Sequence, residues 1–462
     1  MARRLVVVVT VLLTMVVPVV APSSARSAPA VVGRSVHPGV AVDDFALTAA
    51  PASVTVTAGY PARFTIATTV VSGGSQPVTL RVTDLPAGVG AVFTPATVAA
   101  GESTRLALHT SISTRPGTFV LTVEGVGASV TRQVEVRLVV RAAAVVRAAF
   151  YYPWFPEAWR QQGLDPFTNY RPTRGLYQVD EATVRSQVAE MREGWITLGI
   201  ASWFGRGSTT DRHWPAMMAG ARNTGFSWAP YYEPESTSQP DAERIAEDLH
   251  YLRATYGGAR SPLAVLPGKG MVVFVYNAND LTTELGCATV DRWNTARDLL
   301  ARRYGETVHV NLKVFPGFRT CAGTPRVDGW HQYGPDRAES DFSAAPGEGS
   351  YTVSPGFWKA GLAYGQAPFL ARNRDRWRSG LTRMNASGAR WQLITTWNEW
   401  GEGTSIEASS GCRNPVPSGT WCDWSGDGLS EPVADLRDVP PPGAPAPTAP
   451  LSAAPPSASS GR

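Results

Sequence analysis

The chain of 462 residues has few charges, because Asp, Glu, Lys and Arg together make up 17% of it, against about 25% in an average soluble protein. Lysine is scarcest, with only Lys269, Lys313 and Lys359 among 42 basic residues, and no basic run is interleaved with aromatics. The net charge is only +4. These features exclude a highly charged disordered chain and argue against nucleic acid as a partner. The hydrophobic share of 43% is enough for a sizeable core.

Long apolar runs are also lacking, apart from one at the N-terminus. Arg3 and Arg4 precede the apolar run Leu5–Val20, and small residues follow it. This order predicts a signal peptide over residues 1–30, cleaved after Ala25 or Ala30, and hence a secreted protein with no membrane contact after cleavage. A membrane anchor is the alternative, but 16 residues that include a proline are short for a span of about 20.

Cysteine is scarce as well, with four residues: Cys287, Cys321, Cys412 and Cys422. Export permits disulfides, and four cysteines allow three pairings. Cys287–Cys321 and Cys412–Cys422 are favoured, because each pair would close one long polar loop region. A zinc site is the alternative, but the sequence has no Cys-x-x-Cys and no ligand-spaced pair among its six histidines. We therefore expect disulfides, no metal and no cofactor.

Tryptophan is absent from the first 150 residues, whereas all fifteen lie between Trp154 and Trp424, which indicates a domain boundary. Before it, residues 45–142 contain short runs in which apolar and polar residues alternate between Gly, Pro and Ser turns. Such period-two alternation predicts an all-β sandwich of immunoglobulin type. Without tryptophans to stack on sugars, this domain is expected to be a spacer or docking domain, with carbohydrate binding as the alternative. The runs are Ser53–Thr57, Arg63–Ile66, Val78–Val82, Arg105–Leu108, Phe119–Val123 and Val134–Leu138.

Residues 146–428 show strands that alternate with helices. Helical stripes spaced i, i+4, i+7 occur at Val184, Val188 and Met191, with Asp180 as a cap, and again in residues 241–252 behind Asp241. Alternation over this length predicts an α/β fold, a (β/α)8 TIM-type barrel. Residues 431–462 are rich in Pro, Ala and Ser and predict a disordered tail. The expected strands are Ala148–Tyr152, Ile196–Trp203, Ser227–Tyr232, Val272–Tyr276, Val308–Val314, Ser350–Ser354 and Leu393–Trp397, with a weak eighth near Gly329–Tyr333.

The densest cluster of polar residues follows the last expected strand, in residues 395–407. It contains Glu399 and Glu402. Gly401 lies between them and Gly403 follows them, and both glycines allow tight backbone turns. Barrel active sites form where strands end, and glycosidic cleavage needs one protonated and one ionised carboxyl group. The alternative is a pair of loop carboxylates that caps a helix or holds an arginine. The spacing alone favours that alternative, because Glu-x-x-Glu is common.

A longer string favours the catalytic interpretation. The sequence Asn398-Glu399-Trp400-x-Glu402-Gly403-Thr404-x-Ile406-Glu407 resembles the signature of glycoside hydrolase family 99, the endo-α-mannosidases and endo-α-mannanases. The resemblance covers residues 146–410 and leaves out the sandwich and the tail. Other segments resemble the family in the same order: residues 150–155, 175–177, 201–205, 229–234, 275–276 and 354–357.

The resemblance implies an endo-acting, retaining hydrolase that cleaves α-mannosidic linkages in polysaccharide through a 1,2-anhydrosugar. Glu399 matches the carboxylate that takes the proton of the substrate's 2-hydroxyl, which then attacks the anomeric carbon. Glu402 matches the group that protonates the departing oxygen and later activates water. A lowered pKa would suit Glu399 and a raised pKa would suit Glu402. The other matched positions are expected to line the sugar subsites or support the loop: Tyr152, Tyr232, Glu233, Tyr276, Asn398 and Glu407.

Aromatic rings near the expected strand ends could stack on sugar faces, and we expect Trp203 and Trp400 to line the cleft first. His213 and His331 are weaker candidates for binding substrate hydroxyls. The chain departs from the family around the subsites, which leaves open the same chemistry on a different glycan; a non-catalytic glycan-binding protein is a third possibility. We expect a monomer with a polysaccharide or oligosaccharide substrate. The departures are Gly401 for histidine, Ser405 for glutamine, Trp203-Phe204 for a double tryptophan, and Glu235 for an aromatic residue.

Overall fold

The computed structural model describes residues 42–321, 327–337, 349–362, 366–413, 416 and 420–445. The expected signal peptide and the end of the expected tail, residues 446–462, lie outside these ranges. No helix in the described part of the chain is long and apolar enough to cross a membrane.

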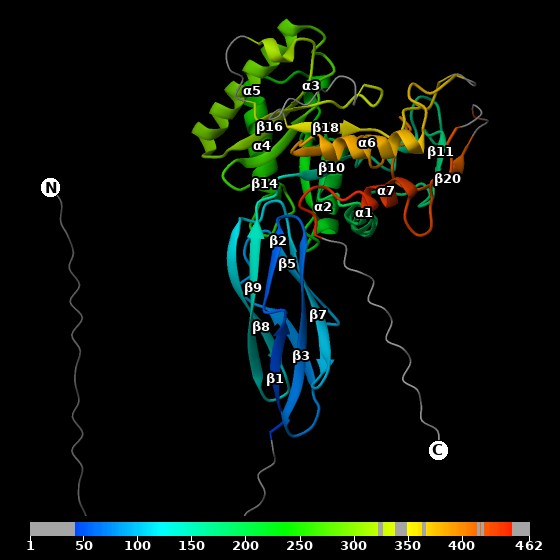
Figure 1. Cartoon of the computed structure of the whole chain (residues 1–462). Coiled ribbons are helices and arrows are strands. Elements are labelled where there is room, and N and C mark those ends of the chain that lie inside the picture. The colour runs from blue at the N-terminus through cyan, green and yellow to red at the C-terminus, as the bar shows by residue number, and fades with distance from the viewer. Residues whose placement is uncertain are drawn as a thin grey trace, which may run out of the picture. The chain divides into compact units, whose positions relative to one another are not determined.

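Residues 44–141 form two β-sheets that pack face to face (Figure 1). One sheet has four strands in the order β1-β3-β7-β5, and the other has five in the order β2-β9-β8-β4-β6. Alternate residues of β3 and β7, such as Phe64, Ile66, Leu106 and Leu108, are buried between the sheets, as the alternation predicted. The immunoglobulin type stays a prediction. The strands are β1 (Asp44–Ala50), β2 (Ser53–Thr57), β3 (Pro61–Ser72), β4 (Pro77–Val82), β5 (Val89–Thr94), β6 (Thr97–Ala99), β7 (Ser103–Thr110), β8 (Gly117–Val126) and β9 (Thr131–Arg141).

The second part of the chain is a nearly closed barrel of eight parallel strands in the order β17-β16-β15-β13-β12-β10-β19-β18. The two end strands approach each other where Ser350 Oγ donates a hydrogen bond of 2.6 Å to the Trp330 carbonyl. All eight expected strands are present, including the weak one. They are β10 (Val146–Tyr151), β12 (Leu198–Trp203), β13 (Ser227–Tyr232), β15 (Gly270–Val275), β16 (Val308–Lys313), β17 (Gly329–His331), β18 (Ser350–Val353) and β19 (Trp391–Ile394). Short β14 (Val265–Leu266) pairs with β15, and β11 (Tyr170–Pro172) pairs with β20 (Ser409–Cys412).

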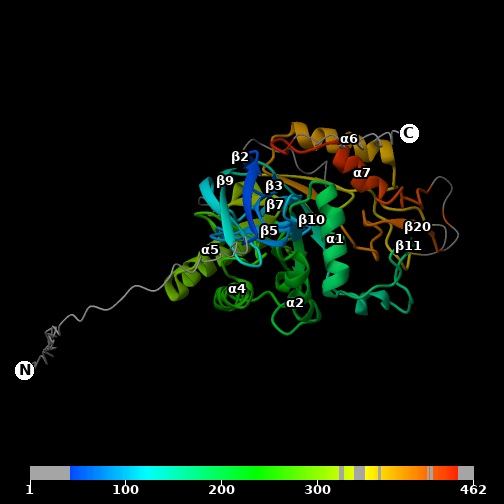
Figure 2. The ribbon, with the colours of Figure 1, turned by 90° about the horizontal axis from the view of Figure 1, so that it is seen from below.

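Helices surround the barrel strands, as the view in Figure 2 shows. Asp180 and Asp241 cap α1 and α4 as expected, because their side chains accept hydrogen bonds from backbone N–H groups of the first turns. In the described residues between β16 and β18, the helical content is limited to the short 3-10 turn η2 (Phe318–Thr320). The helices are α1 (Glu181–Glu193), α2 (Thr209–Ala221), α3 (Pro234–Thr237), α4 (Ala242–Tyr256), α5 (Thr283–Tyr304), α6 (Arg374–Ala386) and α7 (Glu431–Asp438), and η1 (Glu157–Trp159) follows β10.

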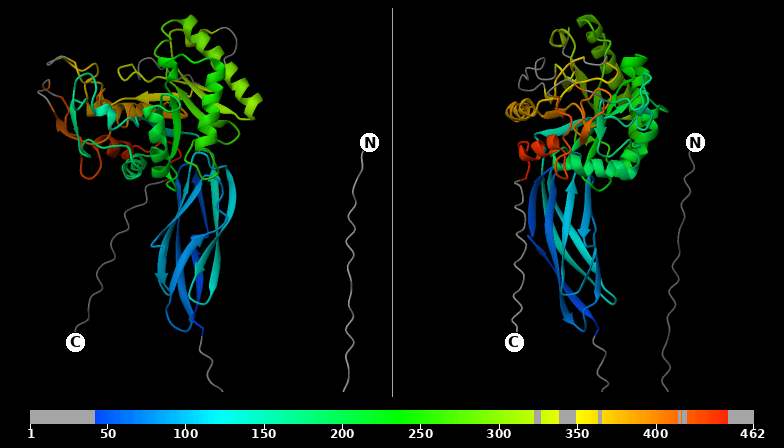
Figure 3. Two further views of the ribbon diagram at one scale, coloured as in Figure 1. Left: turned by 180° about the vertical axis from the view of Figure 1, so that it is seen from behind. Right: turned by 90° about the vertical axis from the view of Figure 1, so that its right-hand side faces the viewer.

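Helix α7 corrects the expected start of the tail, because residues 431–438 are ordered and packed rather than disordered. Val433 and Leu436 are buried, and Ser430 caps the helix by accepting a hydrogen bond from Val433 N. Arg374 of α6 donates to Glu431 and Asp435 at 2.7–3.1 Å. In Figure 3, α7 (red) lies beside α6 (orange). The Pro-rich composition of the following residues hid this short amphipathic segment.

Arg147 of β10 connects α7 to the barrel. Its side chain is fully buried and its guanidinium donates to the carbonyls of Leu436 and Val439, at 3.0 and 2.9 Å. It also donates to Gln392 Oε1 of β19 and to Asn385 Oδ1 at the end of α6, both at 3.1 Å. The acceptors on α7 and on the residue after it are therefore part of the barrel's hydrogen-bond network.

Candidate active site

The loop after β19 folds back on itself at the carboxyl end of the barrel. Thr396 Oγ1 accepts a hydrogen bond of 2.9 Å from Glu399 N, and the Glu399 side chain accepts one of 3.2 Å from Glu402 N. Asn398 fastens this loop to the end of β10, because its amide oxygen and nitrogen bond the backbone N–H and carbonyl of Tyr152 at 2.8 and 3.0 Å. Asn398 is thus a buried positioning group for the two glutamates.

Glycines shape this loop where the sequence predicted tight turns. Gly403 has a left-handed φ of 66°, and a Cβ there would lie 2.6 Å from the Trp358 carbonyl oxygen. A Cβ at Gly401 would lie 2.5 Å from the ring of Phe167. Larger residues at either position would displace the backbone that carries Glu402.

Glu402 is one wall of a cavity of about 660 Å³. Tyr333 Oη donates a hydrogen bond of 3.1 Å to Glu402 Oε2, and the ring of Tyr276 lies 5.5 Å from the ring of Tyr333. Lys313 also lines the cavity, with its ammonium 5.2 Å from the Tyr276 ring centroid. The cavity therefore joins an acid, two phenols and a cation at the carboxyl ends of neighbouring strands.

A third carboxyl group, Glu233, follows β13 and is almost fully buried. Ser202 Oγ donates to its Oε1 at 3.1 Å. Burial, with a contribution from the charge of Glu402, raises the pKa of Glu233 to about 8. At neutral pH this side chain is therefore mostly protonated and can donate a hydrogen bond.

The pKa values of the catalytic candidates differ from the expectation in one respect. Burial and the neighbouring charge of Glu402 raise the pKa of Glu399 well above its usual range, although the amides of Glu402 and Gly401 oppose this. Burial also raises the pKa of Glu402, against the opposing hydrogen bond from Tyr333 and the charge of Lys359. The lowered pKa that would suit Glu399 is therefore not found, because Glu399 is only 5% exposed and is close to the charges of Glu402 and Glu233.

The carboxyl groups have aromatic neighbours on the inner side of the barrel. Tyr152 stacks on Trp154 with ring centroids 4.4 Å apart, and Trp154 in turn stacks on Phe204 at 6.4 Å. Trp154 is half-buried, and its Nε1 has no hydrogen-bond partner within the described ranges. Tyr152 is only 5% exposed, so half-buried Trp154 is the one of the two with ring surface available for stacking.

Three residues that the sequence placed in the cleft lie elsewhere. Trp203 and Tyr232 are fully buried on the outer, helix-facing side of the barrel strands, where Trp203 Nε1 donates to Asp211 and Tyr232 Oη to Asp248. Trp400 is also fully buried, stacked on Trp424 beneath the loop. None of the three offers an exposed face to a sugar.

Tyr231 and Tyr333, which the sequence interpretation did not select, face the barrel interior instead. Tyr231 is the neighbour of Tyr232 in β13, and successive strand residues point to opposite faces. Its ring lies 5.6 Å from that of Tyr276, and its hydroxyl is 3.1 Å from Nε2 of His331, which is fully buried. The only signal for Tyr333 was its place at the end of the weak eighth strand.

Glu407 lies behind the loop, where Trp400 Nε1 donates a hydrogen bond of 3.3 Å to its carboxylate. Its carboxylate accepts hydrogen bonds from Arg174 at 3.0 Å, Gln187 at 2.9 Å and Tyr177 Oη at 2.7 Å, and it is 1% exposed. It is therefore part of the framework behind Trp400, and does not face the cavity.

Among the described residues, no three His, Cys, Asp or Glu side chains are grouped as metal ligands.

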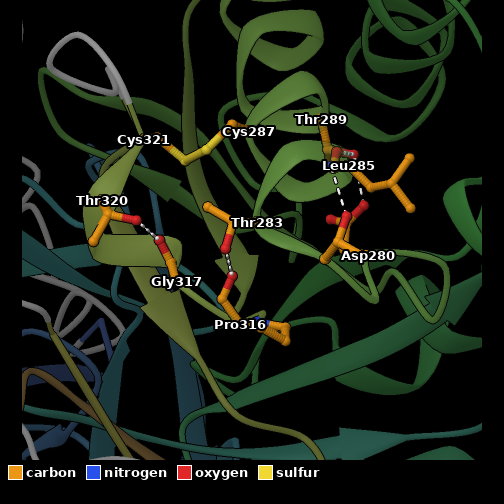
Figure 4. Close-up of a disulfide and its surroundings, with 10 residues drawn as sticks. Asp280, Thr283, Leu285, Cys287, Thr289, Pro316, Gly317, Thr320 and Cys321 are labelled. Carbon is orange, nitrogen blue, oxygen red and sulfur yellow. Dashed lines mark hydrogen bonds between the residues drawn. A yellow bond between two sulfur atoms is a disulfide. The ribbon is translucent and has the colours of Figure 1, made fainter.

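Both disulfides favoured by the sequence form, Cys287–Cys321 and Cys412–Cys422. The first fastens the cavity wall formed by residues 315–319 to the start of α5 (Figure 4). Thr283 of α5 adds a hydrogen bond of 2.9 Å to the Pro316 carbonyl. The disulfide therefore fixes a segment that borders the site of Glu402.

Comparison with known proteins finds no matching family model and no matching curated protein. Among solved structures, the chain is similar to the family 99 endo-α-mannosidase from Bacteroides thetaiotaomicron, with 17% identity, a TM-score of 0.50, and 63% of this chain and 95% of that one covered. A complex of that enzyme with bis-tris-propane gives a TM-score of 0.49. A family 123 glycoside hydrolase from Clostridium perfringens gives 0.34 at 8% identity. The first similarity shows that the barrel has the same fold as that mannosidase.

Proposed function

We propose that the protein is a secreted, endo-acting, retaining glycoside hydrolase that cleaves α-mannosidic linkages in polysaccharide. The observation that carries this proposal is the placement of Glu399 and Glu402 on one loop at the carboxyl end of the barrel, with Glu402 lining a cavity and bonded to Tyr333. The resemblance of this loop to the family 99 signature and the shared fold support it. The two disulfides accord with an extracellular protein.

In the proposed reaction, Glu399 in its ionised form takes the proton of the substrate's 2-hydroxyl. The 2-oxygen then attacks the anomeric carbon, while the bond to the departing oxygen breaks and Glu402 gives that oxygen its proton. Glu402 next takes a proton from water, which opens the 1,2-anhydro ring at the anomeric carbon, and Glu399 returns its proton to the 2-oxygen. Two inversions give net retention.

The electrostatics of the site favour one ionised and one protonated carboxyl group in this pair, although burial raises the pKa of both and does not select Glu399 as the ionised one. The reaction starts with one proton on the Glu399–Glu402 pair, and two close buried carboxyl groups favour the state in which only one is ionised. Glu233 matches a family position that lines a sugar subsite, and its protonated form would donate a hydrogen bond to a sugar oxygen.

Gly401 favours a different glycan as the second candidate substrate. The family usually has histidine here, but a Cβ at this position would lie 2.5 Å from the Phe167 ring. A histidine therefore does not fit this backbone, and the contacts it would make must be absent or replaced. The chemistry of Glu399 and Glu402 would be the same on such a glycan.

The domain organisation is also a proposal: a signal peptide over residues 1–30, an immunoglobulin-like sandwich over 45–142 and a catalytic barrel from residue 146. The packing of α7 extends the proposed catalytic domain from residue 428 to about 445. We propose that the mature protein is a monomer with a polysaccharide as its partner.

The test uses the chain from residue 31 to 462 as wild type and as Glu399→Gln and Glu402→Gln, with exposed Glu247→Gln on α4 as the matched control. Each protein is incubated with α-mannans and a panel of other α-glycans. Products are followed by chromatography, and the anomeric configuration is read by NMR.

Oligosaccharides of retained configuration from α-mannan, lost in both site variants and kept in Glu247→Gln, are the expected result. Release from another glycan alone would replace mannan by that glycan. Binding without release in all four proteins would refute the hydrolase and favour a glycan-binding protein.

A further inference from the structure

A second cavity, of about 1030 Å³, lies at the opposite end of the barrel from Glu402. Its barrel side is formed by α1 and α2 and by residues 192–197 and 222–224. These residues lead from the two helices into β12 and β13, so the cavity lies at the amino ends of those strands. Its other side is formed by β2, β3, β5 and β7 of the sandwich. The two cavities share no lining residue.

Direct contacts hold the two sides of this cavity together. The N–H of Val265 donates to Ser113 Oγ at 2.9 Å, and the N–H of Gly88 donates to the Ala259 carbonyl at 2.9 Å. Tyr60 of the sandwich packs edge to face on Trp195 of the barrel, with ring centroids 5.9 Å apart. The cavity is therefore a feature of the folded chain with a fixed lining.

Arginine dominates the charged lining, with five guanidinium groups and two carboxylates. Two of the arginines are neutralised locally, because Arg185 pairs with Glu181 at 2.9 Å and Arg437 with Asp438 at 3.3 Å. The described residues place no carboxylate within ion-pair distance of the other three, Arg63, Arg192 and Arg222. The cavity thus has an excess of positive charge that internal ion pairs leave uncompensated.

Two of the polar groups are also withdrawn from water. The guanidinium of Arg192 donates a long hydrogen bond of 3.5 Å to the Gly59 carbonyl, and burial lowers the pKa of Arg192 to about 10. His109 Nδ1 is buried without a hydrogen-bond partner in the described part of the chain. Burial and the charges of Arg192 and Arg63 lower the pKa of His109 to about 4, so the ring is neutral at pH 7. A buried polar atom without a hydrogen-bond partner is costly, and a hydroxyl group of a bound saccharide would satisfy His109 Nδ1.

The aromatic part of the lining suits a sugar ring. Trp195 adopts a left-handed φ of 62°, which is rare for a bulky residue, and its Nε1 donates to the Arg437 carbonyl at 2.8 Å. Val54 and Val92 add apolar surface. Sugars present apolar faces to aromatic rings and hydroxyls to polar groups, while guanidinium groups bind carboxylate and phosphate through charge-assisted hydrogen bonds.

We propose that this cavity is a second glycan site, which binds an acidic saccharide, that is, a sugar with carboxylate or phosphate groups. Arg63, Arg192 and Arg222 bind the acidic group, and Trp195, with Tyr60 packed behind it, contacts the sugar ring. The sandwich is then a docking domain that completes this site together with the barrel.

The test measures binding by calorimetry with the chain 31–462 carrying Glu402→Gln, so that no substrate is consumed. The probes are tetragalacturonate for carboxylate, a mannose 6-phosphate-capped tetrasaccharide for phosphate, and neutral mannotetraose. The main variant is Arg63→Gln with Arg222→Gln, because both side chains are exposed and their loss leaves the core intact. The matched control of equal charge is Arg137→Gln with Arg302→Gln, which are exposed and outside both cavities.

We expect at least one acidic probe to bind, and we expect added salt to weaken this binding. Its affinity should be about tenfold or more lower in the Arg63/Arg222 variant and should change less than twofold in the control variant. The acidic probe that binds identifies the acidic group. Arg192→Gln, checked for folding by its unfolding midpoint, should weaken binding as well. Failure of both acidic probes, equal loss in the control, or equally tight binding of mannotetraose would overturn the proposal. Hydrolysis plays no part in this readout, so the result is independent of the proposed reaction.

Discussion

The substitution Leu436→Ala tests whether α7 is part of the folded barrel or belongs to a flexible tail. Leu436 is fully buried, and its side chain packs on Gly194, where even a Cβ would lie 3.3 Å from Leu436 Cβ. Truncation of a fully buried leucine costs about 2–5 kcal/mol of the free energy of unfolding. That is a large part of the roughly 5–15 kcal/mol typical of a folded protein. In a flexible tail the same change would cost almost nothing.

The matched control is Leu285→Ala, which removes the same atoms from a helix but at a side chain that is 50% exposed. Its expected cost is below about 1 kcal/mol. Urea unfolding followed by tryptophan fluorescence gives both values, and limited proteolysis reports whether the C-terminus has become accessible. Equal urea midpoints for the two variants, with no change in proteolysis, would show that α7 does not contribute to the stability of the barrel.

Three further predictions concern the site. Because the pKa of Glu233 is raised from 4.5 to about 8, the folded state keeps a proton that the unfolded state releases, and the free energy of unfolding falls as the pH rises through this range. The urea midpoint of Glu233→Gln should therefore fall less between pH 5 and pH 8 than that of the wild type. An equal fall would contradict the raised pKa of Glu233. Trp154→Ala should lower kcat/KM on the substrate about tenfold, and it should also lower the urea midpoint, because this ring packs on Tyr152 and Phe204; full activity would remove Trp154 from the subsites. Replacing Cys287 and Cys321 by serine opens a loop of 34 residues, which should cost about 3–4 kcal/mol of the free energy of unfolding and reduce activity. If the variant had the urea midpoint of the wild type, the disulfide would not fix the cavity wall.

Much of the fold follows from the sequence, because hydrophobic patterning sets it. The barrel strands were found as short apolar runs, and the sandwich strands β2, β3, β4, β7, β8 and β9 as alternating runs. The other three sandwich strands, β1, β5 and β6, were not among the expected runs; glycine interrupts β5, and β6 has only three residues. The number of barrel strands was predictable even where their ends were not.

The direction of side chains in the barrel was not predictable from the pattern. Strands of a parallel barrel are buried on both faces, so apolar residues follow one another and the period of two is lost. Tyr231 and Tyr232 look alike in the sequence, yet Tyr231 faces the interior and Tyr232 faces the helices. The same ambiguity led to the selection of Trp203 as a residue of the cleft.

The second cavity was not visible in the sequence for another reason. Arg63 and Arg192 are separated by about 130 residues and belong to different layers of secondary structure. In a chain where nearly all basic residues are arginine, no single one of them is distinctive. Only the packing of β3 and β7 against the end of α1 brings these side chains to one place.

The buried guanidinium of Arg147 has a consequence for how the chain is made. It lies in the first strand of the barrel, but two of its acceptors, the carbonyls of Leu436 and Val439, are among the last described residues to be synthesised. An emerging chain that contains β10 therefore lacks two acceptors of this guanidinium until residues 436–439 have been made. The barrel can reach its final set of hydrogen bonds only after residue 439 has been synthesised, whereas the sandwich has all of its strands about 300 residues earlier.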